Sequence, residues 1–536
     1  MRRALATLAV LLELAPVARG HVGSPNVFFE GRAGAYPVSV VVRPPAALPG
    51  AAQVSVRVDA SDVRAVSLLP VLWEAGREGS PAPVLAERVQ AERLWSADVW
   101  LLRPGSYGFQ VRVEGERGIG EAAVPVNVLG TGKQAMKPGV AAGLGVLGLL
   151  LLAGAGLIAQ AVGREGSLRP GGLATPRDAV RGQWAGGVAL LVLVAGGVGC
   201  GVRWQKMASA YLAAGMQKPE PVAATLRTEG QRVFLELRQA DEPSARPPWS
   251  ALVPDHGKLM HLFLIRQPAQ DIFAHLHPVR QGADTFTVQL PALPAGGYEL
   301  YGEVTYENGL NQTLVAHVAL PQQTGSLPGV PESPTNFFGS FLCGVPTSVP
   351  TAPGALGPDR DDSWHVGRDS GNVPGNRKSA KPPAGALVAP LMGGYTLLFE
   401  NASAVAAGRE ASLRFVATAP GAGEAELQPY MGMRGHAVVR RADGSVFAHL
   451  HPAGSFSMAS QEAFLRAAES ANVPGQAEPT PAKMPAATAS ASAGRVAFPY
   501  EFPKPGTYRL WIQVRIAGRV LTGVYDLEIA KAAAHG

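Results

Sequence analysis

The phrase Phe-Ala-His-Leu-His-Pro occurs twice in this chain, at residues 273–278 and again at residues 447–452. Side chains on a β-strand alternate between two faces, so the two histidines of each phrase would point to the same side of a strand. Two imidazoles on one face are a ready pair of ligands for a transition metal. The first chemistry that the sequence indicates is therefore metal binding.

Each phrase is preceded by further candidate ligands. The first copy has His256 and His261, and the second has Met431 and His436 in the corresponding places. The interval between the single histidine and the phrase differs by one residue, which a hairpin loop can absorb. The predicted ligand set is His256, His261, His275, His277, Met431, His436, His449 and His451.

The exchange of His256 for Met431 favours copper over zinc as the metal. Imidazole binds zinc, copper, iron and nickel alike, whereas a thioether is a soft ligand that prefers Cu(I). We therefore expect copper, as Cu(I) or Cu(II). The alternative is structural, with the histidines packed in the core or hydrogen-bonded at a corner of each domain. Seven of the 11 histidines lie within residues 256–277 and 436–451, which favours a site.

Length and composition indicate several β-rich domains together with membrane segments. The chain has 536 residues, of which 47% are hydrophobic and only 16% charged, with abundant Gly and Pro. Single hydrophobic cores rarely grow beyond about 250–300 residues. This profile is typical of extracytoplasmic β modules with membrane helices, and it argues against a helical cytosolic enzyme.

Several classes of function are disfavoured by what the sequence lacks. The formal net charge of +6 is not gathered into basic runs with interleaved aromatics, so nucleic acid is not an expected partner. The two cysteines, Cys200 and Cys343, form no disulfide framework and lie in no blue-copper motif. P-loop, nucleophile-elbow and dinucleotide fingerprints are absent, so the sequence favours a binding protein while leaving catalysis open.

Three apolar stretches predict the location of the protein. Residues 1–20 resemble a secretory signal peptide, after which the mature chain would start at His21. Residues 139–162 and 184–202 are each long and apolar enough for a transmembrane helix. The loop 163–183 is rich in arginine and is therefore expected in the cytoplasm. We expect a bacterial inner-membrane protein whose large domains face the periplasm or the cell exterior.

The remaining chain is predicted to be mainly β, as three immunoglobulin-like β-sandwiches. In three places a turn containing Gly leads through a tyrosine, Tyr107, Tyr298 or Tyr508, into an alternating strand. A tyrosine at such a corner is familiar in immunoglobulin-like folds. The expected sandwiches are residues 21–132, 220–322 and 395–531, with the helix pair between the first two. Residues 323–394 are expected to be a Pro/Gly-rich linker, and residues 468–494 a disordered insertion.

The two His-rich segments resemble the YtkA-like domains of bacterial envelope proteins and, more loosely, the periplasmic copper-resistance carriers. The resemblance rests on His261 with residues 275–278, and on His436 with residues 449–452. It covers about 100 residues in each copy. It implies β-sandwiches that handle metal in the envelope through His and Met, and partners among other envelope metal-handling proteins. The membrane spans and the duplication depart from a soluble carrier.

These observations lead to one preferred function and two alternatives. The preferred function is a membrane-anchored extracytoplasmic protein that captures or transfers copper through two duplicated His/Met sites. One alternative is a two-copper oxygenase with unlike sites in its two domains. The other is an envelope scaffold that binds proteins and no metal, because β-sandwiches support many unrelated functions.

Overall fold

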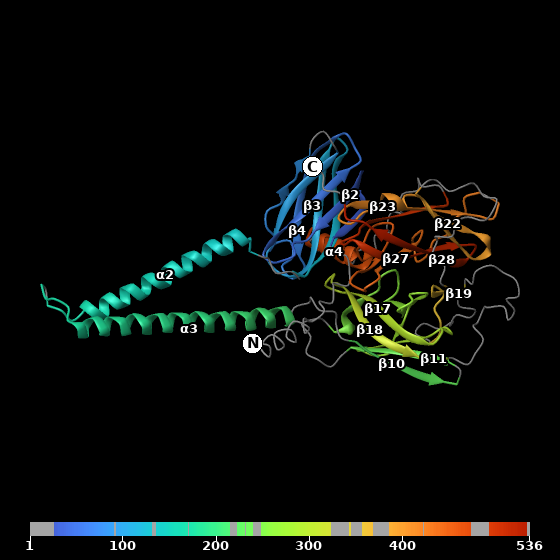
Figure 1. Ribbon diagram of the computed structural model, residues 1–536. Coiled ribbons are helices and arrows are strands. Elements are labelled where there is room, and N and C mark those ends of the chain that lie inside the picture. Colours follow the sequence, from blue (N-terminus) through green and yellow to red (C-terminus); the bar gives the residue numbers. More distant parts are fainter. Residues whose placement is uncertain are drawn as a thin grey trace. The chain divides into compact units, whose positions relative to one another are not determined.

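The computed structural model describes twelve stretches of the chain, so the predicted signal peptide 1–20 and His21 lie outside the described residues. The described stretches are residues 26–89, 93–130, 136–169, 171–214, 222–230, 232–239, 248–322, 342–344, 356–367, 385–421, 423–472 and 493–532. They contain six sheets, and the two long helices lie in sequence between the first and second β domains. The predicted fold class, mainly β with a pair of apolar helices, is confirmed (Figure 1).

The first sandwich packs two antiparallel sheets around a valine-rich core. Its alternating buried and exposed residues bring one face of each sheet inward. The strands are β1 (Val27–Ala33), β2 (Tyr36–Arg43), β3 (Gly50–Val58), β4 (Val63–Leu72), β5 (Val84–Leu85), β6 (Glu87–Arg88), β7 (Leu94–Leu101), β8 (Gly105–Gly115) and β9 (Gly118–Val128). The sheet orders are β1-β2-β3-β7-β6 and β5-β4-β8-β9.

The second sandwich carries the first histidine copy on its larger sheet. Its strands are β10 (Val222–Glu229), β11 (Arg232–Gln239), β12 (Leu252–Val253), β13 (His261–Gln267), β14 (Ile272–Leu276), β15 (Val279–Arg280), β16 (Thr285–Gln289), β17 (Gly296–Tyr306), β18 (Asn311–Leu320), β19 (Leu342–Gly344) and β20 (Ser363–Val366). The smaller sheet runs β10-β11-β16-β15. The larger runs β12-β17-β13-β14-β20-β19, with β18 also paired to β17.

The third sandwich carries the second histidine copy in the same way. Its strands are β21 (Leu387–Pro390), β22 (Thr396–Phe399), β23 (Glu410–Thr418), β24 (His436–Arg441), β25 (Phe447–Leu450), β26 (Arg495–Glu501), β27 (Gly506–Ile516) and β28 (Arg519–Ile529). The sheets run β21-β22-β23-β26 and β25-β24-β27-β28. Helix α4 (Met458–Asn472) follows the histidines of β25.

All three predicted tyrosine corners are present, each near the start of a long strand. The hydroxyl groups of Tyr107, Tyr298 and Tyr508 each donate a hydrogen bond to the carbonyl four residues earlier, at 3.0, 2.7 and 2.7 Å. These bonds satisfy a buried hydroxyl and fix the chain where it enters β8, β17 and β27. The equivalent corners place β17 and β27 in equivalent positions of their sandwiches.

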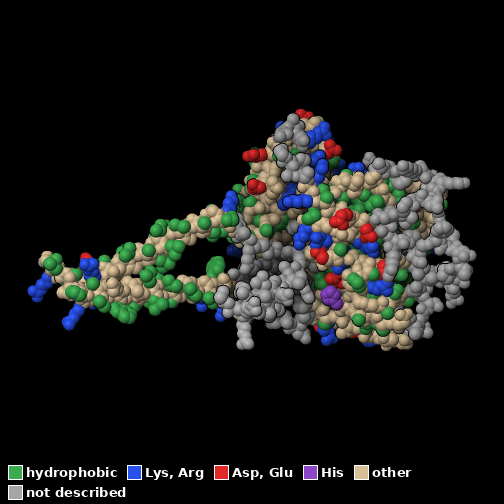
Figure 2. All heavy atoms as spheres, viewed as in Figure 1, with side chains coloured by type: hydrophobic (Ala, Val, Ile, Leu, Met, Phe, Trp, Pro, Cys, Tyr) green, Lys and Arg blue, Asp and Glu red, His purple; other side chains and the backbone are tan. Residues whose placement is uncertain are grey.

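Helices α2 (Pro138–Glu165) and α3 (Pro176–Ala214) form an antiparallel pair, and each is long and apolar enough to cross a membrane. The predicted spans 139–162 and 184–202 lie inside them. Glycines lie where the helices meet, since a Cβ on Gly163 would come within 2.6 Å of Ala185. Large apolar side chains such as Leu149 and Leu191 are about 70% exposed. Figure 2 shows hydrophobic side chains along both helices.

Two segments differ from their sequence predictions. Residues 323–394 are not all linker, because β20 pairs with β14 and β21 belongs to the third sandwich. The surrounding sequence is rich in Pro and Gly, which predicted a linker. Trp364 and His365 are nevertheless buried, because β20 pairs with β14 as part of the sheet. In the insertion 468–494, α4 continues to Asn472, and residues 473–492 lie outside the described chain.

The two His-rich sandwiches pack sheet against sheet through reciprocal aromatic contacts. Tyr301 of β17 stacks on Phe447 of β25 with ring centroids 3.9 Å apart, and Trp511 of β27 stacks on Phe273 of β14 at 5.1 Å. Each contact joins a long strand of one sandwich to the His-bearing phrase of the other. The shared cluster is closed by Phe263, Ile265, Val438 and Val524. This packing brings the two histidine copies to one interface.

The first sandwich joins this interface from the side through α4 and the loop before it. Phe456 and Met458 belong to the hydrophobic core of the first sandwich, and the Phe456 ring lies 5.5 Å from that of Phe29. Gln461 of α4 donates a hydrogen bond to the Ala123 carbonyl at 2.9 Å. The segment that follows the second histidine copy therefore packs against the first sandwich.

Candidate metal centre

The histidines of each copy are placed by one antiparallel hairpin. In the second sandwich, β13 pairs with β14 so that Phe263 lies opposite His275. In the third, β24 pairs with β25 so that Val438 lies opposite His449. The single histidine starts the first strand of each hairpin, and the last histidine follows directly after the second strand. The hairpin expected from the spacing therefore brings three histidines of each copy together.

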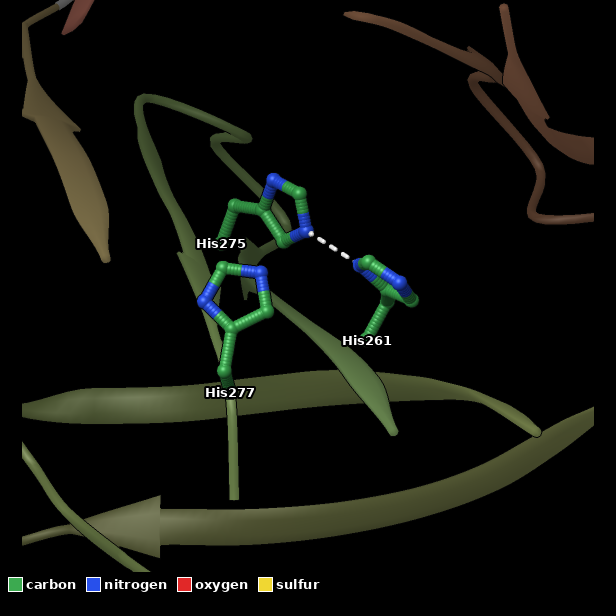
Figure 3. A group of neighbouring side chains, drawn as sticks. All are labelled: His261, His275 and His277. Atoms are coloured by element: carbon green, nitrogen blue, oxygen red, sulfur yellow. Dashed lines mark hydrogen bonds between the residues drawn. The ribbon is translucent and has the colours of Figure 1, made fainter. Parts of the chain in front are cut away.

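The first trio consists of His261, His275 and His277 (Figure 3). One nitrogen from each ring lies within 4.8 Å of the other two, and His261 Nδ1 is 3.2 Å from His275 Nε2. The three residues are at most 4% exposed. Two nitrogens bound to one metal at about 2.0–2.1 Å lie about 3.3–3.5 Å apart, so the observed separation fits shared coordination.

The second trio repeats this geometry with His436, His449 and His451. Its three nitrogens also lie within 4.8 Å of one another, and His436 Nδ1 is 3.1 Å from His449 Nε2. The residues are at most 7% exposed. Both trios are thus buried, compact sets of three nitrogens.

In the first trio, oxygen atoms hold the far side of every ring. His261 Nε2 lies 3.2 Å from the Asp255 carbonyl, His275 Nδ1 lies 3.0 Å from Gln513 Oε1, and His277 Nδ1 lies 2.9 Å from Asp362 Oδ1. A carbonyl, an amide oxygen and a carboxylate accept hydrogen bonds, so each ring donates its N–H outward. Metal-bound histidines are oriented in the same way.

The outward bonds leave lone pairs facing each other inside the first trio. Since His261 and His275 donate from their far nitrogens, neither has a proton for the 3.2 Å contact between His261 Nδ1 and His275 Nε2. His277 Nε2 is buried and has no hydrogen-bond partner within the described part of the chain. Buried polar atoms in this state are rare in folded proteins, and a cation would satisfy all three.

The second trio also has an outward oxygen partner on each ring, but its carboxylate contacts the middle histidine instead of the last one. His436 Nε2 lies 3.2 Å from the Tyr430 carbonyl, His451 Nδ1 lies 3.3 Å from the Phe456 carbonyl, and His449 Nδ1 lies 2.9 Å from Glu303 Oε2. Burial raises the pKa of Glu303 to about 8, and Asp255 adds to the shift. A cation in the trio would favour the charged carboxylate, because an opposite charge lowers a carboxyl pKa.

The outward partner of one ring in each trio comes from the opposite sandwich. Gln513 of β27 contacts His275, and Glu303 of β17 contacts His449. Gln513 lies opposite His436 in its own sheet, and Glu303 lies opposite His261. The Tyr430 hydroxyl also lies 3.3 Å from His275 Nδ1. Each trio is therefore completed by the other copy.

Burial favours the neutral form of five of the six trio imidazoles. It lowers the pKa of His451 to about 4, and it holds the pKa values of His261, His275, His436 and His449 well below the ordinary value, with neighbouring histidines adding to the shifts. A neutral imidazole has the free lone pair that a metal requires. These five imidazoles therefore favour the form that a metal binds.

The other two predicted ligands are His256 and Met431, and His256 belongs to neither compact trio. They occupy equivalent positions in the two copies, with φ values of 51° and 48°, and each is followed by a glycine with φ near 80°. Met431 packs with Tyr430 and Val520. The ring of His256 lies near the second trio, 5.0 Å from that of His451. Six of the eight predicted ligands form the two trios, and His256 lies beside the second.

Sequence reasoning missed the outward partners of the rings. Glu303 and Gln513 each lie five residues after a corner tyrosine, Tyr298 or Tyr508, so alignment of the repeats on these tyrosines would have paired them. Asp362 was hidden in the predicted linker. Asp255 uses its backbone carbonyl toward His261, while its carboxylate lies 3.5 Å from His256 Nε2.

Comparison with known proteins gives one family match, which covers only part of the chain. A family model described as a domain of unknown function (DUF8832) matches residues 391–531, the third sandwich. No curated protein matches the chain in sequence. The match does not bear on the YtkA-like resemblance or on metal binding.

Several solved structures align over most of the chain at very low similarity. One is a tetra-tandem repeat from the extending region of a large adhesion protein, at 9% identity and TM-score 0.14, covering 90% of this chain and 97% of that one. A bacterial ice-binding adhesin aligns at 6% identity and TM-score 0.14, covering 90% and 92%. Escherichia coli alpha-2-macroglobulin aligns at 9% and TM-score 0.17, with 95% of this chain against 23% of that one. Such scores carry no argument about function.

Proposed function

We propose that this chain is a membrane-anchored extracytoplasmic protein that binds copper at two three-histidine centres and captures or passes on the metal. The observation that carries the proposal is the first trio. Its rings donate outward to Asp255 and Gln513, so the nitrogens of His261 and His275 meet at 3.2 Å with lone pairs only. A buried cation is the simplest partner for such an arrangement.

Charge favours a monovalent ion in these centres. The cost of burying an ion rises with the square of its charge, so a divalent ion costs about four times as much as a monovalent one. Each trio has one carboxyl group behind it, Asp362 or Glu303. One Cu(I) with one carboxylate leaves no net charge, and neutral imidazole is a suitable ligand for copper.

The placement of the sandwiches supports an anchor of two membrane spans. Asn127, before the helix pair, donates a hydrogen bond at 2.7 Å to the carbonyl of Asn311, after the pair. Both flanks must therefore lie on one side of the membrane, as two crossings require. The short connection bears Arg164, Arg169, Arg177 and Arg181. Positive residues favour the cytoplasm, which would place the sandwiches outside.

Burial of the centres favours holding and transfer over oxygenase chemistry. An oxygenase needs an open coordination position that oxygen and substrate can reach. The trio histidines are at most 7% exposed. The scaffold alternative accounts for the sandwiches but provides no partner for the inward-facing nitrogens.

Metal content of the purified full chain tests the proposal. We expect two Cu(I) per chain by competition with a chromophoric chelator, one in His277→Ala or His451→Ala, and none in the double variant. The matched control is His317→Ala, because His317 is an exposed histidine of the second sandwich. A wild-type chain that takes up no copper in either oxidation state would overturn the proposal.

A further inference from the structure

We propose that His256 is a fourth ligand of the second centre, donated by the second sandwich to the trio of the third. The inference rests on the proposed function and makes the two centres unequal. The first would have three imidazoles from one sandwich, and the second would have four imidazoles from two sandwiches.

Ring separations place His256 with the second trio. Within that trio, ring centroids are 4.5–5.3 Å apart. The His256 ring lies 5.0 Å from His451 and 5.8 Å from His436. It lies 6.2 Å from His261, and the rings of the first trio are 4.7–5.5 Å apart. The distance between the rings of His256 and His451 is therefore within the range found between the rings of one trio.

The free nitrogen of His256 is available for a ligand. Its side chain is only 10% exposed, and its Nε2 atom is buried without a hydrogen bond within the described residues. The Asp255 carboxylate lies 3.5 Å from this nitrogen, and it also accepts a hydrogen bond from the backbone of Ala459. Like Nε2 of His277 and His451, this nitrogen is buried without a hydrogen bond among the described residues.

The backbone holds His256 in an unfavourable conformation, whose free-energy cost other interactions must offset. Its φ of 51° is uncommon for a residue with a side chain, and strained residues concentrate at binding sites. The short hairpin between Asp255 and Lys258, closed by two 2.9 Å backbone bonds, keeps it there. Met431 has the same backbone but packs with Tyr430 and Val520. The fourth imidazole is therefore specific to the second centre.

The unequal ligand sets give the centres different metal preferences. Four imidazoles are suited to tetrahedral zinc and to Cu(II), whereas three neutral imidazoles in a dry site are suited to Cu(I). The second centre should therefore bind a divalent ion more tightly than the first. Because His256 and the trio belong to different sandwiches, this ion would also tie the two together.

Variants that retain only one metal centre allow the affinity of each centre to be measured separately. His277→Ala leaves the second centre intact, and His451→Ala leaves the first. His256→Asn is the test substitution, since Asn tolerates a positive φ and the fold is preserved. With Zn²⁺ as the probe, His256→Asn should weaken the second centre by at least about 10-fold, comparable to the loss of a supporting partner. It should leave the first centre unchanged.

The matched control is His317→Asn, which changes an exposed histidine of the same sandwich and should leave both affinities unchanged. Equal weakening of both centres by His256→Asn, or no weakening of the second, would overturn the fourth-ligand assignment. Thermal unfolding of each metal-free variant checks that the fold is kept, and His256→Gln replaces His256→Asn if it is not. Failure of the wild-type chain to bind any metal would instead overturn the proposed function.

Discussion

At the scale of single residues, the two copies differ most where a side chain supports a ligand. Glu303 and Gln513 occupy equivalent strand positions and contact His449 and His275, respectively. A carboxylate strengthens the ligand that it orients and balances the charge of a cation, whereas an amide only orients it. Each centre therefore has one carboxyl partner, but it supports His277 in the first centre and His449 in the second.

Substituting each of these residues by the other type should change the Cu(I) affinity of the two centres in opposite directions. Glu303→Gln should weaken Cu(I) binding at the second centre by about 10–100-fold, and Gln513→Glu should strengthen the first. Chelator competition on single-centre variants measures both effects. Glu307→Gln, which changes an exposed carboxylate of the same sandwich, is the control. Unchanged affinities in both exchanges would show that the outward contacts do not tune the centres.

The sequence contained most of the candidate ligands but not their arrangement. The period of a strand and the repeated phrase were enough to identify six converging histidines, because these depend on local geometry. The outward partners come from strands distant in sequence, and Gln513 contacts a ring in the other copy. Contacts across a domain interface leave no local pattern. The sequence grouped His256 with its own copy, whereas its ring lies beside the trio of the other copy.

At the scale of elements, β20 supports the first centre from within a predicted linker. It pairs with β14, so that Ser363 lies opposite His275, and Asp362 just before it contacts His277. The linker was predicted from the composition of a long segment, and a buried strand of four residues has little effect on that composition. The sandwich cores and tyrosine corners were predictable because their signals recur within a few residues.

Acid should loosen β20 through His365. Burial lowers the pKa of His365 to about 4, with Arg509 adding to the shift, whereas an unfolded histidine titrates near 6.5. Between these values only the unfolded chain gains the proton, so stability is present above about pH 6.5 and falls toward pH 4. The loss is about 3 kcal/mol.

Unfolding by urea at several pH values measures this dependence in the metal-free protein. His365→Gln should reduce the loss between pH 6.5 and 4 by about 3 kcal/mol relative to wild type. His317→Gln, at an exposed position, should leave the profile unchanged. A wild-type profile in His365→Gln would contradict the assignment.

The aromatic contacts between the sandwiches should support both centres. Trp511→Ala removes the stacking on Phe273 and leaves a cavity, which typically costs about 3–5 kcal/mol. Because Phe273 starts the phrase that contains His275, copper binding at the first centre should weaken as well. Calorimetry and chelator competition give the two readouts, and Trp100→Ala, at an exposed position, is the control. Lower stability with unchanged binding would separate the interface from the centres.

At the scale of the whole molecule, the helix pair should leave only its short connection in the cytoplasm. In a chain with Cys200 and Cys343 replaced by Ser, Thr175→Cys should react with an impermeant thiol reagent only after the membrane is opened. Glu116→Cys, at an exposed position of the first sandwich, should react in intact spheroplasts. The reverse pattern would place the sandwiches inside the cell.

Fusion of both copies in one polypeptide allows differences that symmetry would forbid. In a homodimer of one sandwich, a twofold axis would impose the same residue on both halves of the interface. Here Glu303 faces His449 while Gln513 faces His275, and a histidine at 256 corresponds to a methionine at 431. Covalent duplication thus lets one pocket evolve toward retention and its neighbour toward release, without either change being copied into the other.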